Sequence, residues 1–261
     1  MAPDLAAAVA PLRADPARSV LLFDFDGTLS PLVDDPAAAR PLPGTVERLD
    51  RLTRSYRLVA AVSGRPVAFL ASHLPPSVAL SGLYGLESRI DGEVVDHPEA
   101  ARWAPVVAEA VRQAEAATAP GAPGHGILVE AKGLSITLHT RTHPELADEA
   151  VALAHRLAGP GGLRVGPAKQ SVELHPPIEA DKGTAVLALA DGAASVLYVG
   201  DDHGDIPAFE ALGQLSSRTP PVSVLGVVVD GPELPAKVRP LGQLVLPDQT
   251  AVLDLLDALA V

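Results

Sequence analysis

The chain has 261 residues and a formal net charge of −12, and apolar residues make up 48% of it. A chain of this length forms one large domain or two small ones, and its apolar content is typical of a globular protein. The acidic balance argues against a nucleic-acid-binding protein, which usually carries a basic stripe, so we expect no nucleic-acid partner. A phosphorylated substrate is not excluded, because a bound divalent metal can reverse the sign of the local charge.

The sequence contains no cysteine, which excludes disulfides, thiolate metal sites and a cysteine nucleophile. No apolar run reaches the length of a membrane span, so we expect no membrane partner. The first residues, MAPDLAAAVAPLRADPARS, lack a basic region before a long apolar run. We interpret them as a mature cytoplasmic N-terminus with one short helix. We also expect a monomer, since the pattern shows no obvious exposed apolar stripe.

The N-terminal part of the chain alternates strand and helix patterns. The expected elements are a strand over 20–27, a helix over 43–56, a strand over 57–65, a helix over 66–74 and a strand with a following hairpin over 78–95. The first is a short apolar run ended by a glycine turn, which is typical of a strand buried on both faces. Asp91-Gly92 predicts the turn of the hairpin. Strands alternating with helices predict a parallel sheet in an α/β fold.

The pattern changes in the middle of the chain and then returns. Residues 99–119 predict a long helix, 127–141 two strands, 144–159 a helix and 162–176 two more strands. This composition predicts an α+β module with an antiparallel sheet. Helices over 181–190, 205–212 and 248–261 then alternate with strands over 195–202 and 222–229. We therefore expect an α/β core, residues 1–98 and 177–261, interrupted by an inserted α+β domain, residues 99–176.

Four short polar segments follow predicted strands: DFDGT (24–28), SGR (63–65), DKG (181–183) and GDDHGD (200–205). The carboxyl ends of parallel strands form the edge at which ligands bind in open α/β sheets. Asp24 and Asp26 are two like charges one residue apart, and a divalent cation is the simplest reason for their proximity. Mg²⁺ takes few protein carboxylates together with water and phosphate oxygens, and Asp201 would supply a further carboxylate.

The same segments supply the parts of phosphoryl transfer. A carboxylate in line with a phosphoryl group can attack it and form an aspartyl-phosphate, while a neighbouring acid protonates the departing alcohol and later activates water. Ser63 can hold phosphoryl oxygens by a hydrogen bond and Lys182 by its charge. Gly27 lets the backbone approach the phosphate closely. Arg65 either binds substrate or opens a helix at the surface.

DxDGT, a serine after the second strand, a distant lysine and GDDxxD together resemble the haloacid dehalogenase superfamily of phosphohydrolases. The resemblance implies a Rossmann-like parallel-sheet core and a Mg²⁺ cofactor. It implies that Asp24 is the nucleophile and Asp26 the acid/base, and that Ser63 and Lys182 bind phosphate. Asp201 would bind Mg²⁺ with Asp24 and the backbone carbonyl of Asp26. Asp202 and Asp205 would support the metal and Lys182.

The inserted domain resembles the larger type of cap in this superfamily. Residues 82–87 (GLYGLE), 129–141 (VEAKGLSITLHTR) and 171–176 (SVELHP) are similar to segments of the trehalose-6-phosphate phosphatase family. That resemblance implies that the sugar hydroxyls bind Glu130, Lys132 and Glu173, since charged groups in a closed cleft recognise hydroxyls strongly. Glu130 and Lys132 could instead be a solvated strand face.

The chain departs from the family in two places. It has GDDHGDIPAF where many members have GDDxTDEDAF, and His139-Thr140-Arg141 where many have an aromatic residue before the arginine. The first departure leaves the three aspartates intact, whereas the second touches substrate choice. Whether His139, His175 or His203 contacts substrate is left open.

The resemblance implies a Mg²⁺-dependent phosphatase that converts trehalose 6-phosphate to trehalose and phosphate through an aspartyl-phosphate. Two alternatives remain open. One is the same chemistry on another sugar phosphate, such as glucosylglycerol phosphate, sucrose phosphate or a sugar monophosphate. The other is a non-catalytic module that binds a sugar phosphate and regulates a partner.

Overall fold

The computed structural model describes residues 4–168 and 170–261. Its chain divides into two compact units, which we call the core unit (Met1–Val95 and Ala180–Val261) and the cap unit (Asp96–Glu179). The ranges expected from the sequence place the cap between 99 and 176, three residues inside each of these bounds. Within the described residues, no helix is long and apolar enough to cross a membrane.

The core unit is built on one sheet in the strand order β12-β11-β10-β1-β2-β3-β4-β5. Its strands are β1 (Ser19–Phe23), β2 (Leu58–Val62), β3 (Ala79–Gly82), β4 (Glu87–Ile90), β5 (Glu93–Asp96), β10 (Ser195–Gly200), β11 (Ser223–Val229) and β12 (Leu244–Leu246). Neighbours from β12 to β3 are parallel, and β4 is antiparallel to β3. The predicted α/β class with a mostly parallel sheet is confirmed. The short strand β12 was not expected from the sequence.

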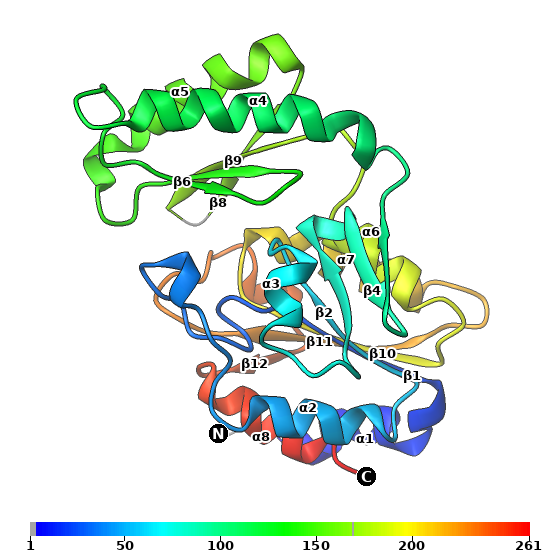
Figure 1. Ribbon diagram of the computed structural model, residues 1–261. Coiled ribbons are helices and arrows are strands. Elements are labelled where there is room, and N and C mark those ends of the chain that lie inside the picture. The colour runs from blue at the N-terminus through cyan, green and yellow to red at the C-terminus, as the bar shows by residue number, and fades with distance from the viewer. Residues whose placement is uncertain (1–3, 169) are drawn as a thin grey trace. The chain divides into compact units, whose positions relative to one another are not determined.

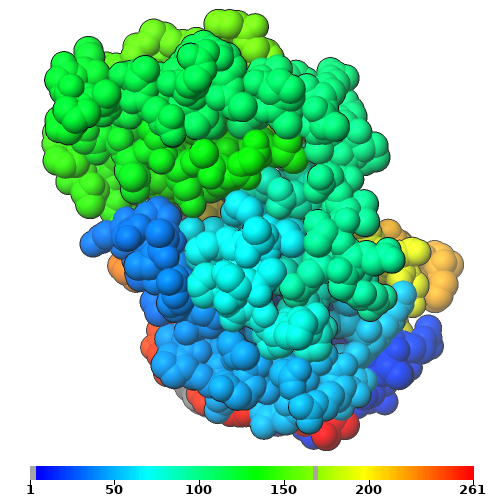
Figure 2. Space-filling view, in the orientation of Figure 1, coloured from blue at the N-terminus to red at the C-terminus, as the bar shows by residue number. Residues whose placement is uncertain are grey.

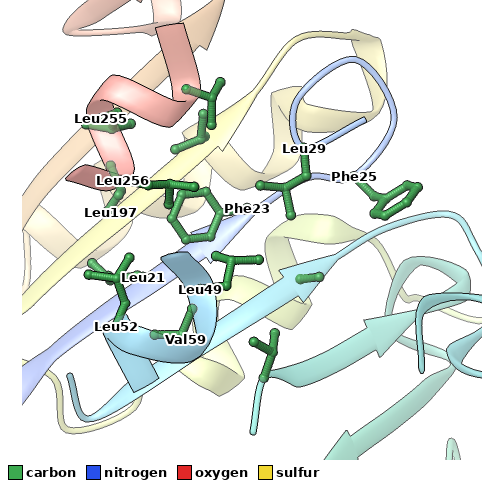
Figure 3. Packing of buried hydrophobic residues seen from close by; sticks show 14 of the residues in the cluster. Leu21, Phe23, Phe25, Leu29, Leu49, Leu52, Val59, Leu197, Leu255 and Leu256 are labelled. Atoms are coloured by element: carbon green, nitrogen blue, oxygen red, sulfur yellow. The ribbon is translucent and has the colours of Figure 1, made fainter. Parts of the chain in front are cut away.

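Helices cover both faces of this sheet (Figure 1). They are α1 (Leu5–Ala14), α2 (Thr45–Thr53), α3 (Val67–Ala71), α6 (Lys182–Leu189), α7 (Ile206–Ser216) and α8 (Thr250–Ala258). Strand alternation divides β1 between two cores, because successive side chains point to opposite faces. Leu21 and Phe23 pack into one core with Leu255 of α8 (Figure 3). Val20 and Leu22 pack into the other, beside residues of α6 and α7. This double burial explains the continuous apolar run of the strand.

The β4–β5 hairpin turns at Asp91 and Gly92, whose φ angles are +52° and +83°. Two consecutive residues with positive φ are typical of the hairpin turn that an Asp-Gly pair favours. The hairpin reaches the molecular surface, where Val94 and Val95 are exposed (Figure 2).

The cap unit is an antiparallel sheet in the order β6-β7-β9-β8, with helices on one face. Its elements are α4 (Ala100–Thr118), β6 (Leu128–Ala131), β7 (Ile136–His139), α5 (Ala147–Gly161), β8 (Arg164–Ala168) and β9 (Ser171–His175). Ile136, Leu138 and Leu174 are fully buried. Side chains at alternating positions point to opposite faces, so the residues between them lie on a separate, largely polar face. That face carries the residues the sequence assigned to sugar binding.

We predict that Leu255→Ala destabilises the core by about 2–5 kcal/mol, because it removes a fully buried side chain and leaves a cavity. The measurement is the free energy of unfolding in urea. Leu241→Ala is the control, since Leu241 is 38% exposed and its truncation should change stability by no more than about 0.5 kcal/mol. Equal losses in the two variants would contradict the packing described here.

Candidate active site

The site lies where the chain order of the strands reverses, between β1 and β10. Such a switch point opens a crevice at the carboxyl ends of parallel strands. Asp24 directly follows β1, Ser63 follows β2, and Asp201 follows β10. Because these strands are parallel neighbours, their ends meet at one edge of the sheet. The structure thereby brings three of the predicted segments to the same edge.

Lys182, from the DKG segment, contacts aspartates of both the DFDGT and the GDDHGD segments. Its Nζ donates to Asp24 Oδ1 and to Asp205 Oδ1, each over 2.6 Å. All three side chains are buried, with at most 4% of any of them exposed. The DKG segment does not directly follow a strand, because β9 ends at His175. It opens helix α6, where a helix was expected from the sequence, and Asp181 and Thr184 form a capping box that places Lys182 in the first turn.

Both carboxylate oxygens of Asp205 accept hydrogen bonds. Its Oδ1 also accepts a 2.6 Å hydrogen bond from the Tyr198 hydroxyl, and its Oδ2 accepts from the backbone N–H groups of Asp201 and Asp202. Tyr198 is fully buried in β10 and was missed by the sequence analysis. A phenol within an otherwise apolar buried strand was the available signal, because a buried hydroxyl usually needs a partner.

The charges of this cluster shift one another's ionisation. Burial raises the pKa of Asp24 well above its usual value; the Lys182 ammonium opposes the shift, and the Asp205 carboxylate adds to it. Burial also opposes the charge of Lys182, but Asp205 and Asp24 outweigh it and raise the pKa of the ammonium well above its usual value. Burial acts to raise the pKa of Asp205, but the charge and hydrogen bond of Lys182 lower it. When ionised, the carboxyl groups of Asp24, Asp201 and Asp205 carry three negative charges against the single positive charge of Lys182.

That excess suits a divalent cation. One oxygen from each of Asp24, Asp201 and Asp205 lies within 4.8 Å of the others. Hard carboxylate oxygens are the donors Mg²⁺ prefers. Since both Asp205 oxygens already accept hydrogen bonds, Asp24 and Asp201 fit the ligand role better, and Asp205 fits a supporting one. Asp202 accepts from the backbone N–H of Gly204 and caps the turn that carries Asp205.

Gly27 is required at its position for two reasons. Its φ is +88°, which glycine adopts without strain, and a Cβ there would lie 2.2 Å from Asp201 Oδ2. The structure therefore shows a close approach between the DFDGT backbone and the Asp201 carboxylate. The predicted approach of Gly27 to a phosphate stays a prediction.

Asp26 pairs with a different basic side chain from the one that pairs with Asp24. Arg65 donates Nε to Asp26 Oδ2 and Nη2 to Oδ1, each over 2.7 Å. Arg65 is 8% exposed; its Nη1 donates to the Pro36 carbonyl, and its guanidinium lies 4.5 Å from the centroid of the Phe69 ring. The two contacts to Asp26 form the planar fork of a bidentate pair. The structure thus places Arg65 on the second aspartate, and its predicted contact with substrate stays a prediction.

Ser63 is 2% exposed. Its Oγ accepts a 3.2 Å hydrogen bond from the backbone N–H of Arg65. A hydroxyl that accepts here keeps its own proton for donation to another acceptor, as the predicted phosphate contact needs.

On the polar face of the cap sheet, Glu130, Thr137 and Glu173 stand in one row across β6, β7 and β9. Lys132 Nζ lies 3.7 Å from Glu130 Oε2 and 3.6 Å from Glu173 Oε1. The three residues predicted to bind sugar hydroxyls are therefore one cluster. Glu173 is 4% exposed.

Two neighbours hold the carboxylates of this cluster. The Ser135 hydroxyl donates to Glu173 Oε1 over 2.8 Å, and His139 Nε2 lies 2.8 Å from Glu130 Oε2. The buried Thr137 hydroxyl has no hydrogen-bond partner in the part of the chain that the structure describes. Of the other histidines left open, His175 contacts the Pro176 carbonyl and His203 is exposed.

Comparisons with known proteins identify the family of this chain. A family model described as trehalose-phosphatase matches residues 22–233. A trehalose-phosphate phosphatase of Mycobacterium leprae is 35% identical over 209 residues, which are 75% of this chain and 48% of that one. The chain thus spans about half the length of the curated relatives it matches.

Solved structures are similar over nearly the whole chain. The C-terminal domain of the C. albicans trehalose-6-phosphate phosphatase has a TM-score of 0.77 at 25% identity, covering 99% of this chain and 98% of that one. The C-terminal domain of the Candida albicans trehalose synthase regulatory protein has a TM-score of 0.67 at 15% identity, covering 98% and 99%, which is a likeness of fold alone. The resemblance seen in the motifs is confirmed: the chain belongs to the trehalose-phosphatase family, a family of phosphoric monoester hydrolases.

Proposed function

We propose that this chain hydrolyses trehalose 6-phosphate to trehalose and inorganic phosphate through an aspartyl-phosphate on Asp24. The observation that carries the proposal is the buried contact of Lys182 with Asp24 and Asp205, beside the Asp201 carboxylate. A buried ammonium next to a carboxylate at a sheet edge suits binding of a phosphoryl group and in-line attack on it. Membership of the family supports the choice of substrate.

In the first step, the Asp24 carboxylate attacks phosphorus and the bond from phosphorus to the sugar oxygen breaks. Asp26 gives a proton to the departing alkoxide. In the second step, Asp26 takes a proton from water, the oxygen of that water attacks phosphorus, and the bond to Asp24 breaks. Ser63 and Lys182 hold phosphoryl oxygens during both steps.

Asp24, Asp201 and the backbone carbonyl of Asp26 would hold Mg²⁺. When bound, the ion supplies positive charge that offsets the charge of the phosphoryl oxygens. Asp205 and Asp202 keep the lysine and the Asp201 loop in place, since their oxygens already accept hydrogen bonds from those elements.

Recognition of the sugar is assigned to the cap unit. Glu130 and Glu173 accept hydrogen bonds from sugar hydroxyls, and Lys132 donates to sugar oxygens. Lys132 Nζ lies within 3.7 Å of both carboxylates, so that acceptors and a donor adjoin in one cluster, which suits a molecule with many hydroxyls. His139 and Ser135 keep the two carboxylates in position.

The test of the substrate is phosphate release with Mg²⁺ from trehalose 6-phosphate, sucrose 6-phosphate, glucosylglycerol phosphate and glucose 6-phosphate. We expect a preference of about a hundredfold or more in kcat/KM for the first, which is about 2.7 kcal/mol of transition-state discrimination. Asp24→Asn should reduce turnover by about a thousandfold or more. Asp50→Asn is the control, because Asp50 lies on α2 with 40% of its side chain accessible. A flat profile would retire the trehalose assignment, and an active Asp24→Asn variant would remove Asp24 as the nucleophile.

Arg65→Lys tests whether the bidentate contact from Arg65 positions Asp26 for proton transfer. A lysine cannot make the bidentate contact, so protonation of a sugar leaving group should suffer. We expect a fall of about tenfold or more with a sugar phosphate. The burst of dinitrophenol from dinitrophenyl phosphate needs no proton on the leaving group, so its rate should change by less than about threefold. Arg89→Lys serves as control, because Arg89 contacts only backbone carbonyls in the hydrogen bonds described. Equal falls with both substrates would remove this role of Arg65.

Glu130→Gln tests recognition by the cap unit. Loss of a charged acceptor should lower kcat/KM for the sugar phosphate by about tenfold or more and leave a small aryl phosphate unaffected. The matched control is Glu149→Gln on α5, whose carboxylate pairs with Arg156 at the surface. If both substrates lost activity equally, Glu130 would act on the fold rather than on the sugar.

A further inference from the structure

The segment Gly82–Glu87, which we call the Tyr84 turn, has a strained backbone that the proposed reaction does not explain. Leu83 and Tyr84 have φ angles of +48° and +59°. Bulky residues rarely adopt this left-handed region, and such strain persists only where surrounding contacts enforce it, often at functional sites. The turn follows β3, whose parallel neighbour β2 ends at the Ser63 segment. It therefore lies at the same sheet edge as the site.

Backbone hydrogen bonds fasten this turn to the Ser63 segment. The N–H of Tyr84 donates to the Ser63 carbonyl over 3.1 Å, and the N–H of Leu83 donates to the Arg65 carbonyl over 3.0 Å. Glu87 Oε2 accepts from the N–H of Val67, the first residue of α3. Both ends of the Ser63–Arg65 segment are thus held by the strained residues.

The Tyr84 ring lies against two glycines from different parts of the site. A Cβ on Gly64 would lie 2.7 Å from both Cζ and the hydroxyl oxygen of Tyr84. A Cβ on Gly204 would lie 3.7 Å from Tyr84 Cε1 and 3.9 Å from Lys182 Cε. The ring therefore lies between the Ser63 segment and the Gly204 turn, and that turn adjoins the Lys182 side chain.

The turn also packs on the helix that carries Lys182. A Cβ on Gly85 would lie 3.6 Å from Ala185 Cβ and 3.7 Å from the Asp181 carbonyl oxygen, both in the first turn or cap of α6. Tyr84 is only partly buried. The Tyr84 turn as a whole thus contacts both elements that carry a proposed phosphate-binding side chain of the core unit, the Ser63 segment through Tyr84 and α6 through Gly85.

We propose that Tyr84 is a positioning residue of the phosphate site, whose ring sets the spacing between the Ser63 hydroxyl and the Lys182 ammonium. The inference rests on the proposed function, in which both groups hold one phosphoryl group. Two donors that grip the same group must keep a fixed separation, and a displacement of about 1 Å can cost a hundredfold in rate. The strained turn keeps the ring in place because its backbone is bonded to the segment that the ring supports.

The first test replaces the ring. Tyr84→Ala should weaken inhibition by orthovanadate with Mg²⁺ by about tenfold, and it should lower kcat/KM for an aryl phosphate and a sugar phosphate by the same factor. Tyr84→Phe keeps the ring and should stay within about threefold of the parent. Tyr56→Ala is the control: this buried tyrosine bonds the Leu259 carbonyl in the opposite core, so its loss should reduce stability and leave vanadate inhibition unchanged.

The second test is a double-mutant cycle with Gly64→Ala. The Gly64 backbone has no left-handed φ, so the added methyl meets mainly the Tyr84 ring. Gly64→Ala alone should weaken vanadate inhibition by about tenfold, whereas in the Tyr84→Ala background it should have no further effect. Additive losses would overturn the inference, because the ring would then not lie against Gly64 in the working protein.

The remaining outcomes separate this inference from the proposed function. If vanadate inhibition is unchanged in Tyr84→Ala while only the sugar phosphate suffers, Tyr84 does not position the phosphate site and the inference is wrong. If the parent hydrolyses no phosphate ester, the proposed function fails. Calorimetric measurement of orthovanadate binding by the parent and by Tyr84→Ala then decides. Binding that is tenfold weaker in Tyr84→Ala would support the inference. Equal binding by the two proteins, or no binding by the parent, would overturn it.

Discussion

The contact on which the rest of the site depends is the buried ammonium of Lys182, shared by Asp24 and Asp205. Without it two carboxylates would lie close together in a dry environment, and an uncompensated buried charge costs about 3–5 kcal/mol. The local structure is arranged around this contact. A capping box starts α6 at the lysine, and the Tyr198 hydroxyl and two backbone N–H groups fix Asp205. The ends of the strands place the aspartates close together, and the positive charge of Lys182 offsets the repulsion between their carboxylates.

Two aspartates one residue apart are stable here because each has its own cation. Asp24 bonds a buried lysine, whereas Asp26 is gripped by the fork of Arg65 and is more exposed, with 31% of its side chain accessible. Carboxylates in different environments can take different roles, because their surroundings set how readily each is protonated. The buried member suits attack on phosphorus. The member with access to solvent suits exchange of protons with the alcohol and with water. The separation of roles follows from the two partners rather than from the aspartates themselves.

Much of the fold was predictable because apolar runs and turn residues report local structure directly. Parallel strands, the hairpin at Asp91-Gly92 and the residues at the strand ends follow from such patterns. Contacts between distant segments do not. The bidentate contact of Arg65 with Asp26 joins residues 39 positions apart in the sequence. The hydrogen bond from the Tyr198 hydroxyl to Asp205 depends on how α7 packs beside β10. The positive φ of Leu83 and Tyr84 carries no sequence signal, since neither residue favours that region. The strand β12 has three residues, too few for a periodic pattern.

The proposed function divides chemistry and specificity between the two units. Every group proposed to act on phosphorus belongs to the core unit, whereas the cluster of Glu130, Lys132 and Glu173 belongs to the cap unit. With two carboxylates and one ammonium, that cluster has excess negative charge, which favours hydroxyl donors and disfavours a second anionic group on the sugar. The departure from the family beside His139 lies next to this cluster, because His139 contacts Glu130. We expect a change there to alter the orientation of the Glu130 carboxylate and to leave the Lys182 contact with Asp24 unchanged. Under the proposed function, substrate choice can therefore vary through the cap unit while the proposed reaction at Asp24 stays the same.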